Sequence, residues 1–385
     1  MEIFNVILVK ISEETKSLTR TKGSSLKTLI ENYLLKNPQW PYMIIQDYVL
    51  IKEYSSDIIN DLTKRFGIDF IAPAKLIDIK SLENDISDYI NYYIMKFKAE
   101  RRRLQSFFIN QQIKSRPEVL EKIREILIRK NLAWSEKYPD LVINIMELDR
   151  NILVFSEIIK CPGGYPCGIG GKVVCLMSGG PDSTLAAWLT ARNGAQIIGI
   201  YLDFGVEKLR GKARLRTIKA ARRLFKDWEI PGKLYIVPFS DIVRKIAKNC
   251  KPKNFFVLLK RYMIRVAELI CEKEGAEAIV TGEIIGEHAS QTAWNLNIIS
   301  LAAEKYPIIR PVISMDKNEI LHKIREIDME LYDIVATSIE ACVLFERITP
   351  TTRAKIQEIE RDEELINITA EDLRHVINEA AIITM

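Results

Sequence analysis

The 385-residue sequence lacks the features of a membrane or secreted protein. It contains no apolar run that approaches the roughly 20 residues needed to span a bilayer. Its N-terminus has neither the basic region nor the cleavage site of a signal peptide. These absences predict a cytoplasmic protein, whose six cysteines are reduced thiols, ligands or nucleophiles rather than a disulfide framework.

Histidine is also scarce. His288, His322 and His375 are scattered along the chain and do not form a set of metal ligands, so they are interpreted as structural or surface residues. Cys161 and Cys167 are too far apart for a CxxC metal site and are interpreted as incidental thiols.

The composition indicates a globular protein with a sizeable core. Hydrophobic residues make up 48% of the chain and charged residues 28%, which is a soluble balance. At roughly 100–200 residues per domain, the length predicts two or three domains. The net charge of +5 permits a nucleic-acid partner without requiring one.

Residues 1–75 alternate strand and helix signals. Strands are predicted at 4–9 and around a turn within 42–52, and helices at 25–35 and 56–66. Two strand–helix units of this size predict a small α+β domain that resembles a ferredoxin-like fold.

Residues 76–165 form a second small unit. A helix is predicted at 81–98, a strand at 107–110 and a helix at 117–129, followed by two closing strands. A basic cluster ends the first of these helices, and it is equally compatible with a solvated face and with contact to RNA. The cluster comprises Lys96, Lys98, Arg101, Arg102 and Arg103.

A Gly- and Pro-rich joint at 161–171 marks the next boundary. From Lys172 onward strands and helices alternate, which predicts a parallel sheet with helices on both faces. Ligands of such sheets lie beyond the carboxyl ends of the strands. The predicted strand cores are 173–177, 197–202, 234–237 and 278–281.

A Ser-Gly-Gly-Pro-Asp-Ser-Thr turn at 178–184 follows the first of these strands and opens a helix. Pro181 suits the first helical position. Backbone N–H groups of such a turn converge at a helix N-terminus and form a site for phosphate. The turn lacks the lysine of the GxxxxGK[ST] loop. The alternative is an ordinary strand-to-helix turn, but Asp182 and the hydroxyls favour nucleotide phosphate.

The densest basic tract lies between the second and third strands of this region. A nucleic-acid backbone would offset the mutual repulsion of its nine cations, and this interpretation is preferred to an exposed helix face. The tract comprises Lys208, Arg210, Lys212, Arg214, Arg216, Lys219, Arg222, Arg223 and Lys226.

The turn at 178–183 resembles the SGGxDS signature of the PP-loop ATP pyrophosphatases. Further stretches narrow the resemblance to ThiI-type tRNA sulfurtransferases, the 4-thiouridine synthetases, in a form without a rhodanese domain. The resemblance covers about 150–385, and the first 150 residues look like the family's ferredoxin-like and THUMP domains. The stretches are Glu157–Gly164, Leu259–Met263, Val280–Glu283, Ser290–Thr292, Arg310–Ser314 with Lys317, and Glu340–Cys342.

The resemblance implies three domains: ferredoxin-like at 1–75, an RNA-binding THUMP domain at 76–165 and a PP-loop domain at 166–385. It implies ATP-dependent sulfur transfer to a tRNA uridine, giving 4-thiouridine at position 8 through an adenylated uracil. Catalytic roles are implied for Asp182, which also holds Mg²⁺, for Lys317 and for Cys342. The implied ATP contacts are Leu176, Met177, Ser178, Gly179, Gly180, Asp182, Ser183, Tyr201, Leu202, Lys260, Gly282 and Gln291.

The partners implied by the resemblance are tRNA and a sulfur donor, either the persulfide of a cysteine desulfurase or free sulfide. A homodimer is a further arrangement known in the family. Some members hold an iron–sulfur cluster near the position of Cys271, but this chain has half of the CxxC pair, and a packed thiol is the preferred interpretation. Two alternatives stay open: another PP-loop enzyme (a different tRNA thiolase or an amidotransferase-type ligase) and a non-catalytic RNA-binding homologue.

Overall fold

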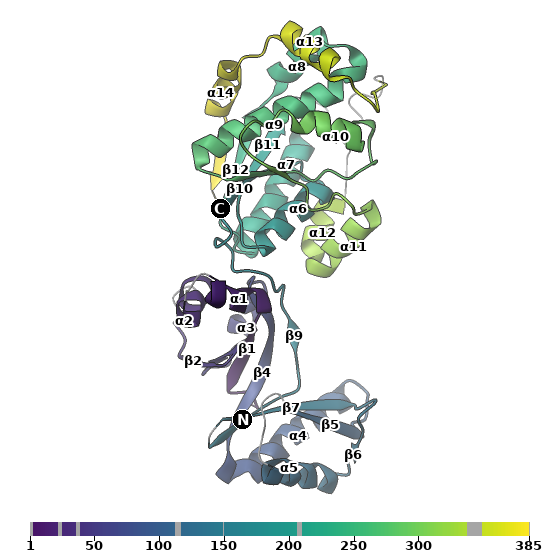
Figure 1. Ribbon diagram of the computed structural model, residues 1–385. Helices are drawn as coiled ribbons and strands as arrows, with labels where there is room; N and C mark the ends of the chain where they lie inside the picture. The colour runs from purple at the N-terminus through teal and green to yellow at the C-terminus, as the bar shows by residue number, and fades with distance from the viewer. Residues whose placement is uncertain are drawn as a thin grey trace. The chain divides into compact units, whose positions relative to one another are not determined.

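The computed structural model describes residues 3–21, 25–35, 39–111, 117–148, 150–205, 210–336 and 349–384. The chain divides into two compact units, Met1–Gly164 and Tyr165–Met385 (Figure 1). Within the described ranges, no helix has the length and apolar character to cross a membrane.

The first unit is built on one mixed sheet with the order β2-β3-β1-β4-β8-β7-β5-β6, and β9 also pairs with β4. The strands are β1 Val6–Ile11, β2 Tyr42–Ile45, β3 Tyr48–Ile51, β4 Ile68–Asp78, β5 Ser106–Gln111, β6 Ala133–Trp134, β7 Leu141–Leu148, β8 Asn151–Phe155 and β9 Ile159–Lys160. The helices are α1 Glu13–Thr21, α2 Leu26–Leu29, α3 Ser56–Leu62, α4 Leu82–Ala99 and α5 Pro117–Arg129.

The long strand β4 serves both halves of the first unit. Its first part pairs antiparallel with β1 and its last four residues pair antiparallel with β8. Helix α4 buries Ile86, Tyr89, Ile90, Tyr93 and Phe97, whose helical spacing gives it one apolar face against the sheet. The division into 1–75 and 76–165 stays a prediction, because β4 runs through residue 75.

The second unit has the predicted parallel sheet, with the order β14-β13-β10-β11-β12-β15, in which β15 alone is antiparallel to its neighbour among the described strands. The strands are β10 Lys172–Leu176, β11 Gln196–Asp203, β12 Gly232–Pro238, β13 Ala278–Val280, β14 Ile308–Ile309 and β15 Ala381–Thr384. The helices are α6 Pro181–Arg192, α7 Arg210–Arg222, α8 Ser240–Asn249, α9 Phe255–Glu274, α10 Ala293–Ser300, α11 Lys317–Ile327, α12 Met329–Ala336, α13 Ile356–Ile366 and α14 Ala370–Asn378.

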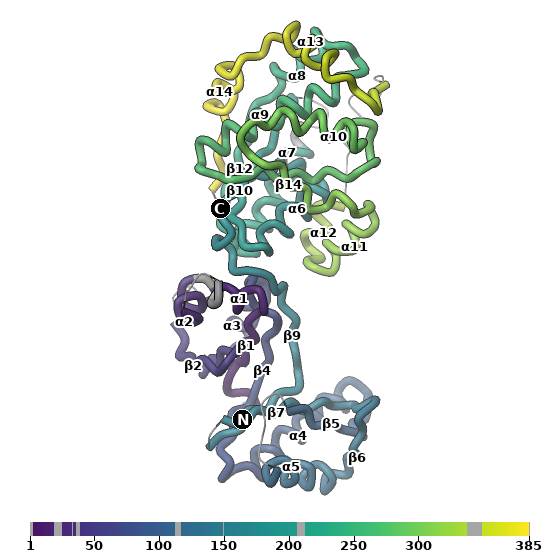
Figure 2. The backbone as a smooth tube through the Cα atoms, in the orientation of Figure 1, coloured from purple at the N-terminus to yellow at the C-terminus, as the bar shows by residue number. Residues whose placement is uncertain are grey.

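The apolar core of the second unit lies between this sheet and α9. Helix α9 buries eleven of its twenty residues and ends at Gly275 in the left-handed conformation. Cys271 on α9 is fully buried in this core, which raises the pKa of its thiol to about 12. Its environment is that of a packed thiol. Helices α11 and α12 lie beside α6 (Figure 2).

Candidate functional site

The phosphate-loop candidate connects β10 to α6. Gly180 caps the helix and Pro181 is its first residue, as predicted. The Ser183 hydroxyl accepts a hydrogen bond from the Ser178 backbone N–H at 3.1 Å and lies 3.1 Å from the Ser178 hydroxyl. These contacts fold the turn over the start of α6, where helix N–H groups attract anions.

Gly179 brings this loop into direct contact with α7. It has a φ of +71°, and a Cβ added to it would lie 2.6 Å from the Thr217 hydroxyl and 2.7 Å from the Thr217 backbone nitrogen. Neither the conformation nor the space suits a larger side chain. The loop therefore approaches both the backbone and the hydroxyl of Thr217 on α7 closely.

Gly282 allows a second close approach, from the segment after β13. A Cβ at this position would lie 2.5 Å from the Ser183 nitrogen and 2.6 Å from the Asp182 carbonyl carbon. The end of β13 thus lies against the first turn of α6, at the carboxyl edge of the sheet where ligands of parallel sheets bind.

An ion cluster joins α6 to α11 at this edge. The Lys317 ammonium lies 2.8 Å and 3.1 Å from the two carboxylate oxygens of Asp182 and 3.0 Å from Glu287. Asp316 and Glu319 form a capping box that begins α11 at Lys317. The helix start therefore delivers the lysine to the loop.

Burial and pairing act on the charges of this cluster. Burial raises the pKa of Asp182 above its ordinary value, although the Lys317 ammonium acts in the opposite direction. Burial lowers the pKa of Lys317, but Asp182 and Glu287 outweigh it and raise that pKa on balance. Lys317 is accordingly a cation at neutral pH.

A second ion cluster surrounds Glu283. The residue is 8% exposed, and its carboxylate lies 2.9 Å from the Lys260 ammonium and 2.8 Å from the Arg310 guanidinium. Burial raises the pKa of Glu283, but the two cations outweigh burial and hold it below the ordinary range. The cluster fixes Lys260 of α9 beside the segment that carries Gly282.

We expect Glu283→Gln to lower the free energy of unfolding by about 3–5 kcal/mol at pH 7, because two cations lose their buried counter-charge. A carboxyl with a lowered folded-state pKa stabilises above its unfolded-state pKa and loses this effect as the pH falls through the folded-state value. The deficit relative to wild type should therefore shrink below pH 4.5, the ordinary value. Urea unfolding across this range measures it.

The exposed Glu304→Gln is the matched control for this titration, and its unfolding should follow wild type at every pH. A deficit of Glu283→Gln that does not change with pH would contradict the assigned ion cluster.

Gln291 lies in a short turn held by Asn295. The Gln291 side-chain oxygen accepts from the Ile284 backbone N–H at 3.4 Å. The buried Asn295 amide donates to the carbonyls of Ala289 and Thr351, at 2.8 and 2.9 Å. This hydrogen bonding ties the Gln291 turn to the segment that follows residue 348.

The predicted nucleoside contacts lie at the ends of β10 and β11. Met177 is buried and Leu176 is partly exposed. Leu176 pairs with Ile200 of β11, and Tyr201 and Leu202 follow Ile200 near the end of that strand. Burial raises the pKa of Tyr201 to about 12, so its hydroxyl keeps its proton at neutral pH.

The structure thus gathers most of the predicted site residues at one sheet edge. The Lys317 ammonium contacts the Asp182 carboxylate, and Gly282 lies against the backbone of Asp182 and Ser183. Cys342 lies outside the described residues. Glu283, Glu287 and Arg310 complete the ion clusters, and no role for them was predicted from the sequence. A signal for two of them exists, since Glu283 and Arg310 stand inside the stretches that carry the family resemblance.

The chemistry of the cluster fits magnesium bound together with nucleotide phosphates. Mg²⁺ usually takes one or two protein carboxylates plus phosphate oxygens and water, and Asp182 and Glu287 lie beside the loop. Among the described residues, no group of three or more potential ligands would hold a metal without such help.

The chain is similar to known proteins over most of its length. The family described as "Thiamine biosynthesis protein (ThiI)" matches residues 168–368. A probable tRNA sulfurtransferase from Clostridium kluyveri is 30% identical over 94% of this chain and 95% of its own length, and one from Halothermothrix orenii is 31% identical over 96% of each. The crystal structure of a 4-thiouridine synthetase–RNA complex with bound ATP has a TM-score of 0.80 at 25% identity, covering 99% of this chain and 100% of that one.

Proposed function

The chain belongs to the ThiI family of tRNA sulfurtransferases, a family of transferases, and we propose that it replaces the C4 oxygen of a tRNA uridine with sulfur at the expense of ATP. The observation that carries this proposal is the ion pair between Asp182 of the 178–184 loop and Lys317 of α11, at the carboxyl edge of the parallel sheet. We place the modified uridine at position 8, as the resemblance implies.

In the proposed first step, the uracil O4 attacks the α-phosphorus of ATP and pyrophosphate leaves. The loop N–H groups and the Lys317 ammonium offset the negative charge that develops on the phosphate oxygens. Mg²⁺, held by Asp182 with Glu287, would add charge neutralisation on the phosphates. Gly282 lets the segment after β13 lie against the loop, and its backbone is proposed to contact ATP together with Leu176, Met177, Tyr201, Leu202, Lys260 and Gln291.

In the second step, a sulfur nucleophile attacks C4 and AMP leaves with the former O4. Free sulfide gives the thiocarbonyl directly after loss of a proton. A persulfide donor, for example that of a cysteine desulfurase, leaves a disulfide between C4 and the donor. The Cys342 thiolate would attack the donor-side sulfur of this disulfide, which releases 4-thiouridine and forms a disulfide between Cys342 and the donor.

The test is mass spectrometry of nucleosides from tRNA incubated with the protein, ATP, Mg²⁺ and sulfide. We expect 4-thiouridine together with one AMP per thiouridine, and neither when ATP is omitted. Pyrophosphate release that is independent of tRNA would point to a ligase and contradict the proposal.

Cys342→Ser is expected to lower 4-thiouridine formation with a persulfide donor by a factor of roughly 10² or more, while tRNA-dependent AMP formation continues. The physical reason is that adenylation needs no thiol, whereas resolution of the disulfide does. Matched reactions with sulfide should keep the product. Wild-type levels of product with the persulfide donor would remove Cys342 from the chemistry.

Cys250→Ser is the control for this variant, because Cys250 is a partly buried thiol at the end of α8. Burial raises its pKa to about 11, so it is a poor nucleophile. Its replacement should leave both AMP and 4-thiouridine formation unchanged.

A further inference from the structure

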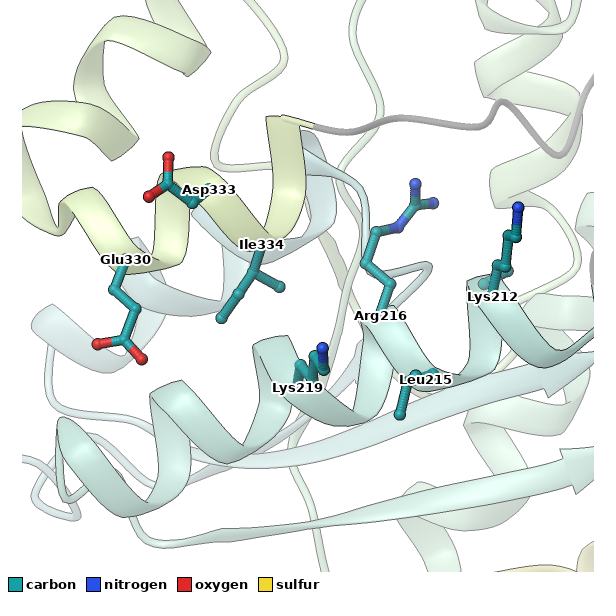
Figure 3. Close-up of a pocket in the computed structure, with 8 residues that line it drawn as sticks. Lys212, Leu215, Arg216, Lys219, Glu330, Asp333 and Ile334 are labelled. Atoms are coloured by element: carbon teal, nitrogen blue, oxygen red, sulfur yellow. The ribbon is translucent and has the colours of Figure 1, made fainter.

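A cavity of about 510 Å³ lies between α7 and α12, outside the ion clusters described above. Its size falls in the usual range for sites that hold small molecules or parts of larger ones. Figure 3 shows Lys212 and Arg216 extending from α7 in the same direction, while Ile334 of α12 reaches toward α7. The lining residues are Lys212, Ala213, Leu215, Arg216, Lys219, Glu330, Asp333 and Ile334.

The α7 wall carries a row of cations. Lys212, Arg216 and Lys219 follow one another at intervals of four and three residues, which places them on one face of the helix. Within the described parts of the chain, no carboxylate forms an ion pair with Lys212 or Lys219. Within these described residues, the charges of Lys212 and Lys219 are thus not neutralised by an ion pair.

The acidic residues of the α12 wall do not cancel this row. Glu330 is engaged by Arg223, whose guanidinium lies 2.7 Å away, and Asp333 extends away from α7 (Figure 3). The groove therefore presents three cations on one side and suits a polyanion with regularly spaced charges.

Apolar side chains also line the groove. Leu215 is 53% exposed although it is a large hydrophobic residue, and Ala213 and Ile334 are further apolar lining residues. Inorganic phosphate would make no favourable contact with these apolar side chains. A nucleic-acid strand would, because its bases and sugars offer apolar faces beside each phosphate.

The groove adjoins the candidate ATP site. Thr217, the residue after Arg216, is in contact with Gly179 of the phosphate loop. Helix α12 packs against both α7 and α6, and α6 begins at that loop. A strand with its phosphates on the α7 row would therefore pass directly beside the loop.

We propose that the α7–α12 groove binds the RNA strand next to the uridine that is modified, with Lys212, Arg216 and Lys219 holding successive phosphates and Leu215 contacting a neighbouring base or ribose. This inference rests on the proposed function for the identity of the RNA. In this arrangement, the groove would position the reactive base beside ATP.

The test compares the full-length protein with the double variant Lys212→Ala/Lys219→Ala by fluorescence anisotropy of labelled tRNA across a range of salt concentrations. Each lost phosphate contact should lower the slope of log affinity against log salt by about 0.7–0.9. The expected result is a slope lower by about 1.5 and an affinity about 10-fold weaker near physiological salt.

The matched control is Lys248→Ala/Lys323→Ala, which removes two exposed cations from α8 and α11. This control should bind tRNA as wild type does. Leu215→Glu adds a second variant, and it should weaken tRNA binding at least as much, because it places a carboxylate among the phosphates. Circular dichroism checks that all variants fold.

Two outcomes would overturn the inference. One is wild-type affinity and salt slope in the groove variants. The other is weakened binding of ATP or pyrophosphate with unchanged tRNA binding, which would make the groove a site for nucleotide phosphates. The failure of the proposed function is separate: wild-type protein would then form no 4-thiouridine, whatever the groove variants bind.

Discussion

Lys317→Ala is expected to lower the rate of tRNA-dependent AMP formation by a factor of roughly 10²–10³, the usual cost of removing a preorganised charge from a developing oxyanion. The substitution removes the cation that lies between Asp182 and Glu287, so the two carboxylates repel the incoming phosphates more strongly. AMP formation is measured with radiolabelled ATP at saturating tRNA. The tRNA affinity, measured in parallel, should stay unchanged.

Lys323→Ala is the matched control for this prediction. Lys323 lies on the same helix, α11, and is exposed to solvent. The Lys323→Ala substitution removes the same charge without changing the ion cluster, so the rate of AMP formation by this variant should equal that of wild type. A Lys317→Ala enzyme that forms AMP at the wild-type rate would contradict the role of Lys317 in the proposed first step.

Much of the second unit could be predicted from the sequence, because its signals are local. Buried parallel strands read as short apolar runs, and 173–177, 197–202, 234–237 and 278–281 correspond to β10, β11, β12 and β13. The Gly-Gly-Pro turn at the start of α6 is likewise a local signal. Together with the carboxyl-edge rule for parallel sheets, these runs place the candidate site.

Other parts of the fold depend on contacts that local patterns do not encode. Strand β14 could not be predicted, because its two residues are too few for a periodic signal. Strand β15 was not predicted either, because its pairing with the distant β12 is not visible in its local sequence. Helix α1, at Glu13–Thr21, is also missing from the prediction, because its apolar face is narrow and its residues are mostly polar.

The candidate site shows the same division. Asp182 and Gly282 stand in recognisable turns, whereas the ion pairs join residues far apart in the chain. Glu283 meets Arg310 across 27 positions, and Glu287 meets Lys317 across 30. A charge pattern along the sequence does not reveal such partners, since most charged residues are solvated. The ATP-binding roles of the site residues stay predictions, and Cys342 lies outside the described residues.

Gly179→Ala is the second substitution for which we expect a large effect, because it combines backbone strain with a steric clash. The left-handed φ of +71° costs a residue with a Cβ about 1 kcal/mol or more. The new methyl group would also lie 2.7 Å from the backbone nitrogen and 2.8 Å from the Cα of Thr217. Since two of the three nearest atoms of Thr217 belong to the backbone of α7, a side-chain rotation cannot relieve the clash and the loop itself must shift.

We expect this shift to weaken the binding of a non-hydrolysable ATP analogue about 100-fold, as small misplacements of a site do, and to lower the free energy of unfolding by about 2–4 kcal/mol. Calorimetric titration and urea unfolding measure the two effects. Gly275→Ala separates strain from clash, because Gly275 has a φ of +62° with nothing within 4 Å of an added Cβ. It should lose only about 1 kcal/mol and keep its ATP affinity. Equal ATP affinities in both variants would mean that the contact between Gly179 and Thr217 does not shape the nucleotide site.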